Sequence, residues 1–337
     1  MTELLFKPKY EINDEMLTLV ANIASKMTSI ADLGTMDRHP PLRNSNRIKA
    51  IHGSLAIENS KLLLWQVEGL RDGKMILADP EDITEAKNCI AAYDRLFELN
   101  PYDVMDFLTA HQILMKDLLW VPGQFRTRNV GVVSGKEIVY LAPPPDSVSG
   151  MMADLFRWIE EANVHPLIKS VIFHYEVEFI HPFLDGNGRM GRMWETRLLG
   201  NWNNVFAWLP VEAMINERRD EYYEALQTSQ NSEDCTAFLL YMLQAIWETM
   251  NKYSEYDEPD SDDDMDPVFI RANKLVDVLG PQSMFVEEIM EGLKLKSKQS
   301  FKKNYLEPAL RLGLIEMTMP QYPTIRDQRY RRKWQKG

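Results

Sequence analysis

The residues that could do chemistry together lie in one short run, His181 to Arg192, which reads HPFLDGNGRMGR. His181 is a candidate general base, because an unperturbed imidazole has a pKa of about 6.5 and accepts a proton near neutral pH. Asp185 offers a carboxylate of the kind that holds Mg²⁺ beside phosphate groups. The run therefore combines a base with a metal-binding carboxylate.

The glycine-rich centre of this run is typical of an anion-binding loop. Gly186, Asn187 and Gly188 stand where a helix begins near Arg189, and the backbone amides at a helix N-terminus attract anions. Arg189 and Arg192 are three residues apart, so their side chains point toward the same region of a helix. Two guanidinium groups and a backbone cradle suit a polyphosphate.

Helices are expected on both sides of the run. Apolar residues three and four apart predict an amphipathic helix at 166–180, which Pro182 ends. The same spacing predicts helices at 84–98, 103–119, 147–163, 189–202, 214–228 and 233–250. The glycines of Gly186 to Gly191 also spell GxGxxG, but a dinucleotide-binding fingerprint follows a strand, and here a helix precedes it.

A zinc site is not indicated. His165, His174 and His181 match no common ligand spacing, and no fourth ligand is evident. We interpret His165 and His174 as surface or helix-face histidines.

A β-hairpin is predicted at 130–141, where two short β-branched runs flank Ser134-Gly135 and three prolines follow. An isolated two-stranded hairpin has little stability of its own, so we expect this hairpin to border a site and not to form the core.

Composition and charge divide the chain. Its 337 residues suggest one large domain and a smaller one, and two cysteines exclude a disulfide framework. An acidic linker is predicted at 254–267, with eight acidic and no basic residues. Residues 268–337 carry 14 Lys or Arg against 7 Asp or Glu, whereas the whole chain has a net charge of −12. Three helices at 268–279, 284–291 and 298–311, then strands at 314–318 and 328–331, predict a winged-helix domain.

The run from His181 to Arg192 resembles the Fic family motif H-x-F-x-[DE]-G-N-G-R-x-x-R at every specified position. Gly123-Gln-Phe-Arg126 is similar to the segment before the family's flap, and the helix from Arg219 to Leu226 is similar to the one lining its adenine pocket. The resemblance implies a mainly α fold: a Fic-type helical domain with a β-hairpin flap, plus a C-terminal winged-helix domain. The domains would be an N-terminal helical region at 1–100, a catalytic core at 101–253, the linker and the domain at 268–337.

The activity that the resemblance implies is transfer of AMP from ATP to a Ser, Thr or Tyr hydroxyl of a protein, with Mg²⁺. His181 would be the base and Asp185 would hold Mg²⁺. The nucleotide would be bound by Gly186, Asn187, Gly188, Arg189, Arg192, Tyr223 and Gln230. The flap would dock an extended target segment through Val130, Val132, Ile138 and Tyr140.

A second motif bears on regulation. Ser54-Leu-Ala-Ile-Glu58-Asn59 is similar to the family's inhibitory pattern [ST]-x-x-x-E-[GN], on a helix expected near 45–60. Glu58 would pair with Arg192 and take the place of the γ-phosphate, because one guanidinium cannot serve both partners.

Alternatives remain open at this stage. The same site could remove AMP, or the chain could be a regulator in which the winged helix binds DNA and the Fic site is a sensor. We expect a cytoplasmic protein with no membrane segment, an unknown protein target, self-modification as a side activity, and a homodimer as in relatives.

Overall fold

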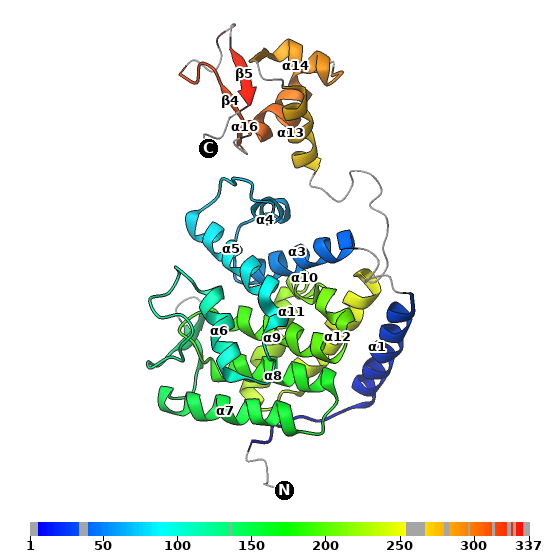
Figure 1. Ribbon diagram of the computed structural model, residues 1–337, viewed down its shortest axis with the longest axis vertical. Helices are drawn as coiled ribbons and strands as arrows, with labels where there is room; N and C mark the ends of the chain where they lie inside the picture. The colour runs from blue at the N-terminus through cyan, green and yellow to red at the C-terminus, as the bar shows by residue number, and fades with distance from the viewer. Residues whose placement is uncertain are drawn as a thin grey trace. The chain divides into compact units, whose positions relative to one another are not determined.

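The structure is a computed structural model that describes residues 6–33, 40–134, 137–253, 267–279, 283–295, 297–311, 314–321, 325 and 328–332. The chain divides into two compact units. The first comprises Met1–Asp72 and Asp79–Tyr256, and the second comprises Asp257–Gly337 with the short segment Gly73–Ala78. The expected mainly α fold is confirmed (Figure 1). The predicted acidic linker falls almost wholly outside the described residues.

The first unit is built around helix α8, Pro166–Ile180, which packs against α7, α9 and α12 (Figure 1). Nearly every face of α8 is buried, including its polar residues His174, Glu176 and Glu178. The helix predicted at 166–180 is confirmed, but the amphipathic character expected of it was wrong. The helices and strands around it are α5 Pro80–Arg95, η1 Leu96–Glu98, α6 Val104–Leu114, β1 Gly131–Ser134, β2 Glu137–Leu141, α7 Pro145–Glu161, α9 Asn187–Trp202, η2 Asn204–Trp208 and α12 Thr236–Tyr253.

The N-terminal helices of this unit are α1 Asp14–Leu33, α3 Pro40–Ile57 and α4 Leu64–Arg71. Helix α1 lies along α12, and α3 packs on α10, Val211–Glu217 (Figure 1). Gly53 permits this packing, because a Cβ there would lie 2.6 Å from the backbone of Glu212 and Ala213. The end of α3 is thereby brought beside α9, where Arg192 donates to Ser54.

The structure divides one of the predicted helices into two. The segment expected as a single helix at 214–228 breaks at Arg218, so that α10 is followed by α11, Arg219–Ser232. The break gives α11 its own direction, and α11 forms one wall of the pocket described below.

The second unit contains α13 Pro267–Val278, α14 Val286–Gly292, α15 Lys298–Phe301, a π-helical turn η3 Lys302–Leu306 and α16 Glu307–Arg311. Its sheet has the order β3-β5-β4, all antiparallel, from Met284–Phe285, Arg329–Arg332 and Ile315–Met317. The strand at Met284–Phe285 was expected to begin a helix, so the sheet has three strands and not two. A small apolar core that includes Leu275, Phe301 and Tyr330 holds this unit together.

Across the described residues of both units, we find no helix that is long and apolar enough to cross a membrane.

Candidate active site

The loop after α8 begins with His181, whose φ of 50° turns the chain away from the helix. Its carbonyl accepts a 2.7 Å hydrogen bond from Nε of the buried Arg126. The same guanidinium also donates to the carbonyls of Ile180, Pro143 and Arg128. Arg126 therefore caps the end of α8 and ties it to both ends of the hairpin.

The imidazole of His181 lies in the wall of a pocket. Burial lowers its pKa below the ordinary histidine value, against the opposing influence of the Glu178 carbonyl and the Glu58 carboxylate. At neutral pH the ring is therefore mostly neutral, which is the form that can accept a proton.

Asn187 and Phe183 hold the centre of the loop. The Asn187 side chain accepts from the backbone N–H of Phe183 at 2.8 Å and donates to its carbonyl at 3.1 Å. The Phe183 ring is fully buried and stacks on His111 at 3.6 Å. The loop is thus fixed by contacts within itself and with α6.

His111 supports the same loop from α6. Its Nδ1 accepts from the Gly123 backbone N–H at 2.8 Å, so Nε2 carries the proton and donates to the Asp185 carbonyl at 3.0 Å. Burial lowers the pKa of His111 to about 4, and the ring keeps this neutral tautomer at physiological pH.

The three glycines of the run are required for different reasons. Gly186 has a φ of 84°, and a Cβ there would also meet Sδ of Met115 at 2.7 Å. A Cβ at Gly191 would lie 2.7 Å from the ring of His174, so this glycine lets α8 and α9 approach closely. Gly188 has space only because it lacks a side chain, since a Cβ would collide with the Glu58 carboxylate.

The two arginines of the run are both held by carboxylates. Arg192 is buried, and its guanidinium donates to Oε1 of Glu58 at 2.6 Å and to the side chain and carbonyl of Ser54 at 3.2 Å. Arg189 donates to Glu85 at 3.0 Å, with the Asp185 carboxylate 3.8 Å away. Burial opposes the charged form of Glu58, but Arg192 outweighs it, so the pKa of Glu58 is lowered. Glu58 and Arg192 are therefore a charged pair at neutral pH.

Glu58 lies in the turn that ends α3, and α11 also contacts this turn. The Asn59 side chain accepts from Arg219 at 2.7 Å, and the hydroxyl of Tyr223 donates to the Ile57 carbonyl at 3.1 Å. Asn59 has a φ of 71°, a left-handed conformation that asparagine tolerates. We call residues 54–59 the brake turn.

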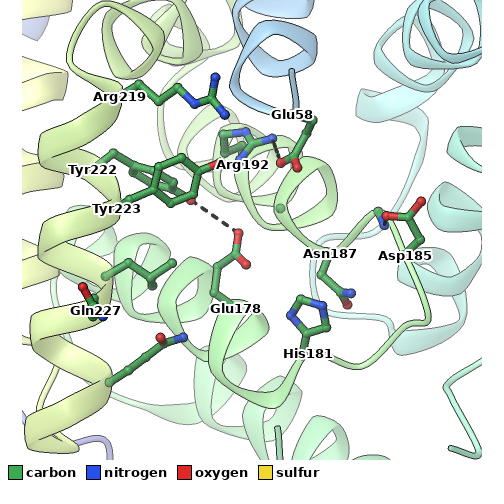
Figure 2. A pocket seen from close by; sticks show the side chains of 14 residues that line it. Glu58, Glu178, His181, Asp185, Asn187, Arg192, Arg219, Tyr222, Tyr223 and Gln227 are labelled. Carbon is green, nitrogen blue, oxygen red and sulfur yellow. Dashed lines mark hydrogen bonds and ion pairs between the residues drawn. The ribbon is translucent and has the colours of Figure 1, made fainter. Parts of the chain in front are cut away.

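These groups surround a pocket of about 520 Å³ (Figure 2). Its lining includes nine of the residues predicted from sequence: Glu58, His181, Asp185, Gly186, Asn187, Gly188, Arg192, Tyr223 and Gln230. Two others, Ser54 and Arg189, contact the pocket region without lining it. The volume is in the range of small-molecule sites.

The hairpin is present, with Gly131 opposite Leu141 and Val132 opposite Tyr140 in antiparallel register. Val130 accepts a backbone hydrogen bond from Ala142 at its base. The side chains of Val132, Ile138 and Tyr140 lie outside the described residues, so their docking role stays a prediction.

Sequence reasoning missed four residues: His111, Arg126, Glu85 and Glu178. Arg126 was noted only as part of a family segment, and the others carry no local signal because their partners are distant in sequence. His174 was interpreted as a surface or helix-face residue, but it is fully buried, and its Nδ1 lies 2.6 Å from Glu195. Burial lowers the pKa of His174 to about 3.

The pocket could hold Mg²⁺ through Asp185 together with the phosphates of a ligand. The described residues contain no group of three or more His, Cys, Asp or Glu that could hold a metal. Asp185 does offer an exposed carboxylate at the pocket, and Mg²⁺ is commonly bound by one or two carboxylates together with substrate phosphates. The site therefore fits a Mg²⁺ ion that arrives with a nucleotide.

Comparison with known proteins identifies the family. The model described as Fic/DOC family matches residues 101–199, and that of the "Filamentation induced by cAMP protein Fic-like, C-terminal domain" matches residues 271–332. A solved Fic family protein from Desulfovibrio desulfuricans G20 is 38% identical, with 98% of this chain and 100% of that chain covered and a TM-score of 0.72. The chain belongs to the Fic family.

More distant relatives agree. Fic-1 from C. elegans shares the fold at 20% identity and a TM-score of 0.55, with 70% of this chain and 73% of that chain covered. The protein adenylyltransferase Fic of Drosophila erecta is 24% identical over 213 residues, and that of Culex quinquefasciatus is 27% identical over 223 residues. These matches cover 60% and 61% of this chain. The chain matches 41% of the length of each of these curated relatives.

Proposed function

We propose that this protein transfers AMP from ATP to a Ser, Thr or Tyr hydroxyl of a protein, and that Glu58 inhibits the transfer. The observation that carries the proposal is that one pocket brings together a neutral histidine, a glycine-rich helix N-terminus and a buried arginine. Relatives named protein adenylyltransferase support it.

In this reaction the target hydroxyl oxygen bonds to the α-phosphorus, and the bond from the α-phosphorus to the bridging oxygen of the β-phosphate breaks. The hydroxyl proton passes to the imidazole of His181, and pyrophosphate leaves. Phosphoryl-type transfer depends mainly on positioning and charge stabilisation. The amides from Gly186 to Gly188 and the Arg189 and Arg192 guanidiniums are suited to that work.

A Mg²⁺ ion held by Asp185 and the phosphates would neutralise charge on the leaving pyrophosphate. Asp185 is placed for this role, because its carboxylate lines the pocket and is 64% exposed, although Oδ1 also accepts from the Gly186 N–H at 2.7 Å.

The proposed inhibition arises because Glu58 and a phosphate group would need the same guanidinium, that of Arg192. Arg192 already carries a charged hydrogen bond to Glu58, and the Glu58 carboxylate occupies the space over Gly188. A phosphate group cannot bind the same donors while Glu58 remains there. Release of the brake turn would open this space.

Transfer of labelled nucleotide onto the protein tests the proposal. We expect Glu58→Gly to become labelled by ATP that carries the label on the α-phosphate, and not by ATP labelled on the γ-phosphate. Adding His181→Ala to Glu58→Gly should abolish the label, because a positioned base contributes about 10²- to 10⁴-fold. Label from the γ-phosphate would instead show phosphate transfer, and no label from either would contradict the proposal.

A further inference from the structure

Glu178 is a pocket residue to which the proposed reaction assigns no role. It lies on α8 one turn before His181, it is 8% exposed, and it lines the pocket. Figure 2 shows it with Tyr222, Tyr223 and Gln227 of α11 on one side, His181 and Asn187 on the other, and Arg192 above.

A chain of buried hydrogen bonds ends at the carboxyl group of Glu178. Its Oε1 accepts from the Tyr222 hydroxyl at 3.4 Å, and that hydroxyl lies 3.1 Å from Nε2 of His174. His174 in turn contacts Glu195, whose pKa burial raises to about 8. A protonated Glu195 can therefore donate to Nδ1 of the neutral His174, which leaves Nε2–H to donate to Tyr222 and Tyr222 to donate to Glu178. Every donor in this chain points toward Glu178, and the chain orients its carboxyl group.

The same oxygen, Oε1 of Glu178, also lies beside the space that the Glu58 carboxylate occupies. A Cβ on Gly188 would lie 3.1 Å from Oε1 of Glu178 as well as against Glu58. Burial raises the pKa of Glu178, Arg192 and His174 oppose the shift, and Glu58 adds to it. A phosphate placed directly on Glu178 would meet an acidic group that shares its surroundings with a second carboxylate, so a neutral part of the ligand suits this position better.

The pocket walls indicate which part that is. Under the proposed function, α11 supplies the wall for the base, with Tyr223, Gln227 and Gln230. The glycine loop and Arg192 supply the wall for the phosphates. In any nucleotide the sugar joins base to phosphate, and Glu178 stands between the two walls (Figure 2).

We propose that the Glu178 carboxyl group hydrogen-bonds the ribose hydroxyls of the donor nucleotide, and so selects a ribonucleotide over a deoxyribonucleotide. This inference rests on the proposed function, because the base wall is assigned through it. Carboxyl groups bind ribose hydroxyls in other nucleotide sites. A buried polar group that loses its partner penalises the analogue that lacks the hydroxyl.

The test compares ATP, 2′-deoxyATP and 3′-deoxyATP as donors in the Glu58→Gly protein, with kcat/KM measured for each. We expect at least one deoxy analogue to be poorer than ATP by about 10-fold or more. Glu178→Ala should lower kcat/KM for ATP and bring the ratio of ATP to that analogue close to one. Glu178→Gln, which keeps the shape and part of the hydrogen bonding, should retain an intermediate ratio.

Glu176→Gln is the matched control. Glu176 is a second buried carboxyl on α8 with a pKa that burial raises to about 8, but it does not line the pocket. Glu176→Gln should leave the ratio of kcat/KM for ATP to that for the deoxy analogue unchanged. If Glu178 had only a structural role, Glu178→Ala would lower kcat/KM equally for all three donors. An unchanged ratio in Glu178→Ala, or equal use of all three donors by the parent, would overturn the inference.

Failure of the proposed function would look different. If Glu58→Gly transfers nothing from ATP, the affinities for the same three nucleotides, measured by calorimetry, still decide the matter. If the parent binds ATP more tightly than a deoxy analogue and Glu178→Ala removes this preference, the contact between Glu178 and the ribose is supported. Equal affinities in the parent would refute it.

Discussion

The loop from His181 to Gly188 and the brake turn meet at one pocket but are held by different kinds of contact. The loop is fixed from behind, through Arg126 on backbone carbonyls, His111 against Phe183, and the Asn187 side chain. None of these three side-chain contacts uses a group that a nucleotide phosphate would need.

The brake turn is held from the front. Its polar partners are Arg192, Arg219 and Tyr223, all of which line the pocket, while its apolar residues Leu55 and Ile57 are buried in the core. A ligand that binds these groups competes with the turn and leaves the loop in place. Under the proposed function, one site would combine a rigidly held reaction centre with an inhibitor that a ligand can displace.

The largest effect should come from breaking the rigid side. Arg126→Met removes hydrogen bonds to four backbone carbonyls, and we expect the free energy of unfolding to fall by about 2 to 4 kcal/mol. Transfer in the Glu58→Gly protein should fall as well, because the loop loses its anchor. Denaturant unfolding and the transfer rate measure the two effects. A variant as stable and active as its parent would show that the loop does not depend on Arg126.

A smaller effect should come from loosening the brake without touching its charge. Asn59→Gly keeps the left-handed backbone and removes only the hydrogen bond to Arg219. For an exposed contact worth about 1 kcal/mol, we expect transfer to rise about fivefold. The initial rate of AMP transfer, set against that of wild type, measures it. If the rate does not change, the contact with Arg219 contributes nothing to inhibition.

The smallest effect concerns pH. Burial lowers the pKa of His181, and the base works only when unprotonated, so activity is lost as pH falls through that lowered value. The acid limb of kcat/KM in Glu58→Gly should therefore lie below about pH 6.5, the midpoint of an ordinary histidine. A pH series of transfer rates measures it, and a midpoint above that value would contradict a buried neutral base.

The sequence predicts what depends on local pattern. Helix α8 and a helix that begins near Arg189 could be expected from spacing, and the structure shows α8 and a helix that begins at Asn187. The pairing of Glu58 with Arg192 could be expected only from the resemblance to the family, and it is present. The contacts of Arg126 and Glu178 could not be expected, because each joins segments whose proximity only the packed fold decides.

The burial of polar residues on α8 was equally hard to predict from the sequence. His174 carries a polar side chain on a helix, and a polar residue is ordinarily exposed unless a partner is buried with it. Its partner Glu195 comes from α9, 21 residues later, and α9 can approach because Gly191 has no side chain. The break at Arg218 was also hidden, since the apolar spacing continues across it.

The central claim is that Glu58 and the nucleotide compete for Arg192. The most direct measurement is the rate of AMP transfer by Glu58→Gly relative to wild type at the same ATP and Mg²⁺ concentrations. Glu233→Gly is the control, because Glu233, like Glu58, directly follows a helix but lies outside the pocket lining. The account predicts a rise of at least about tenfold for Glu58→Gly, from the loss of one charged hydrogen bond, and no rise for the control. Equal rates for Glu58→Gly and wild type, with transfer detectable in both, would contradict it.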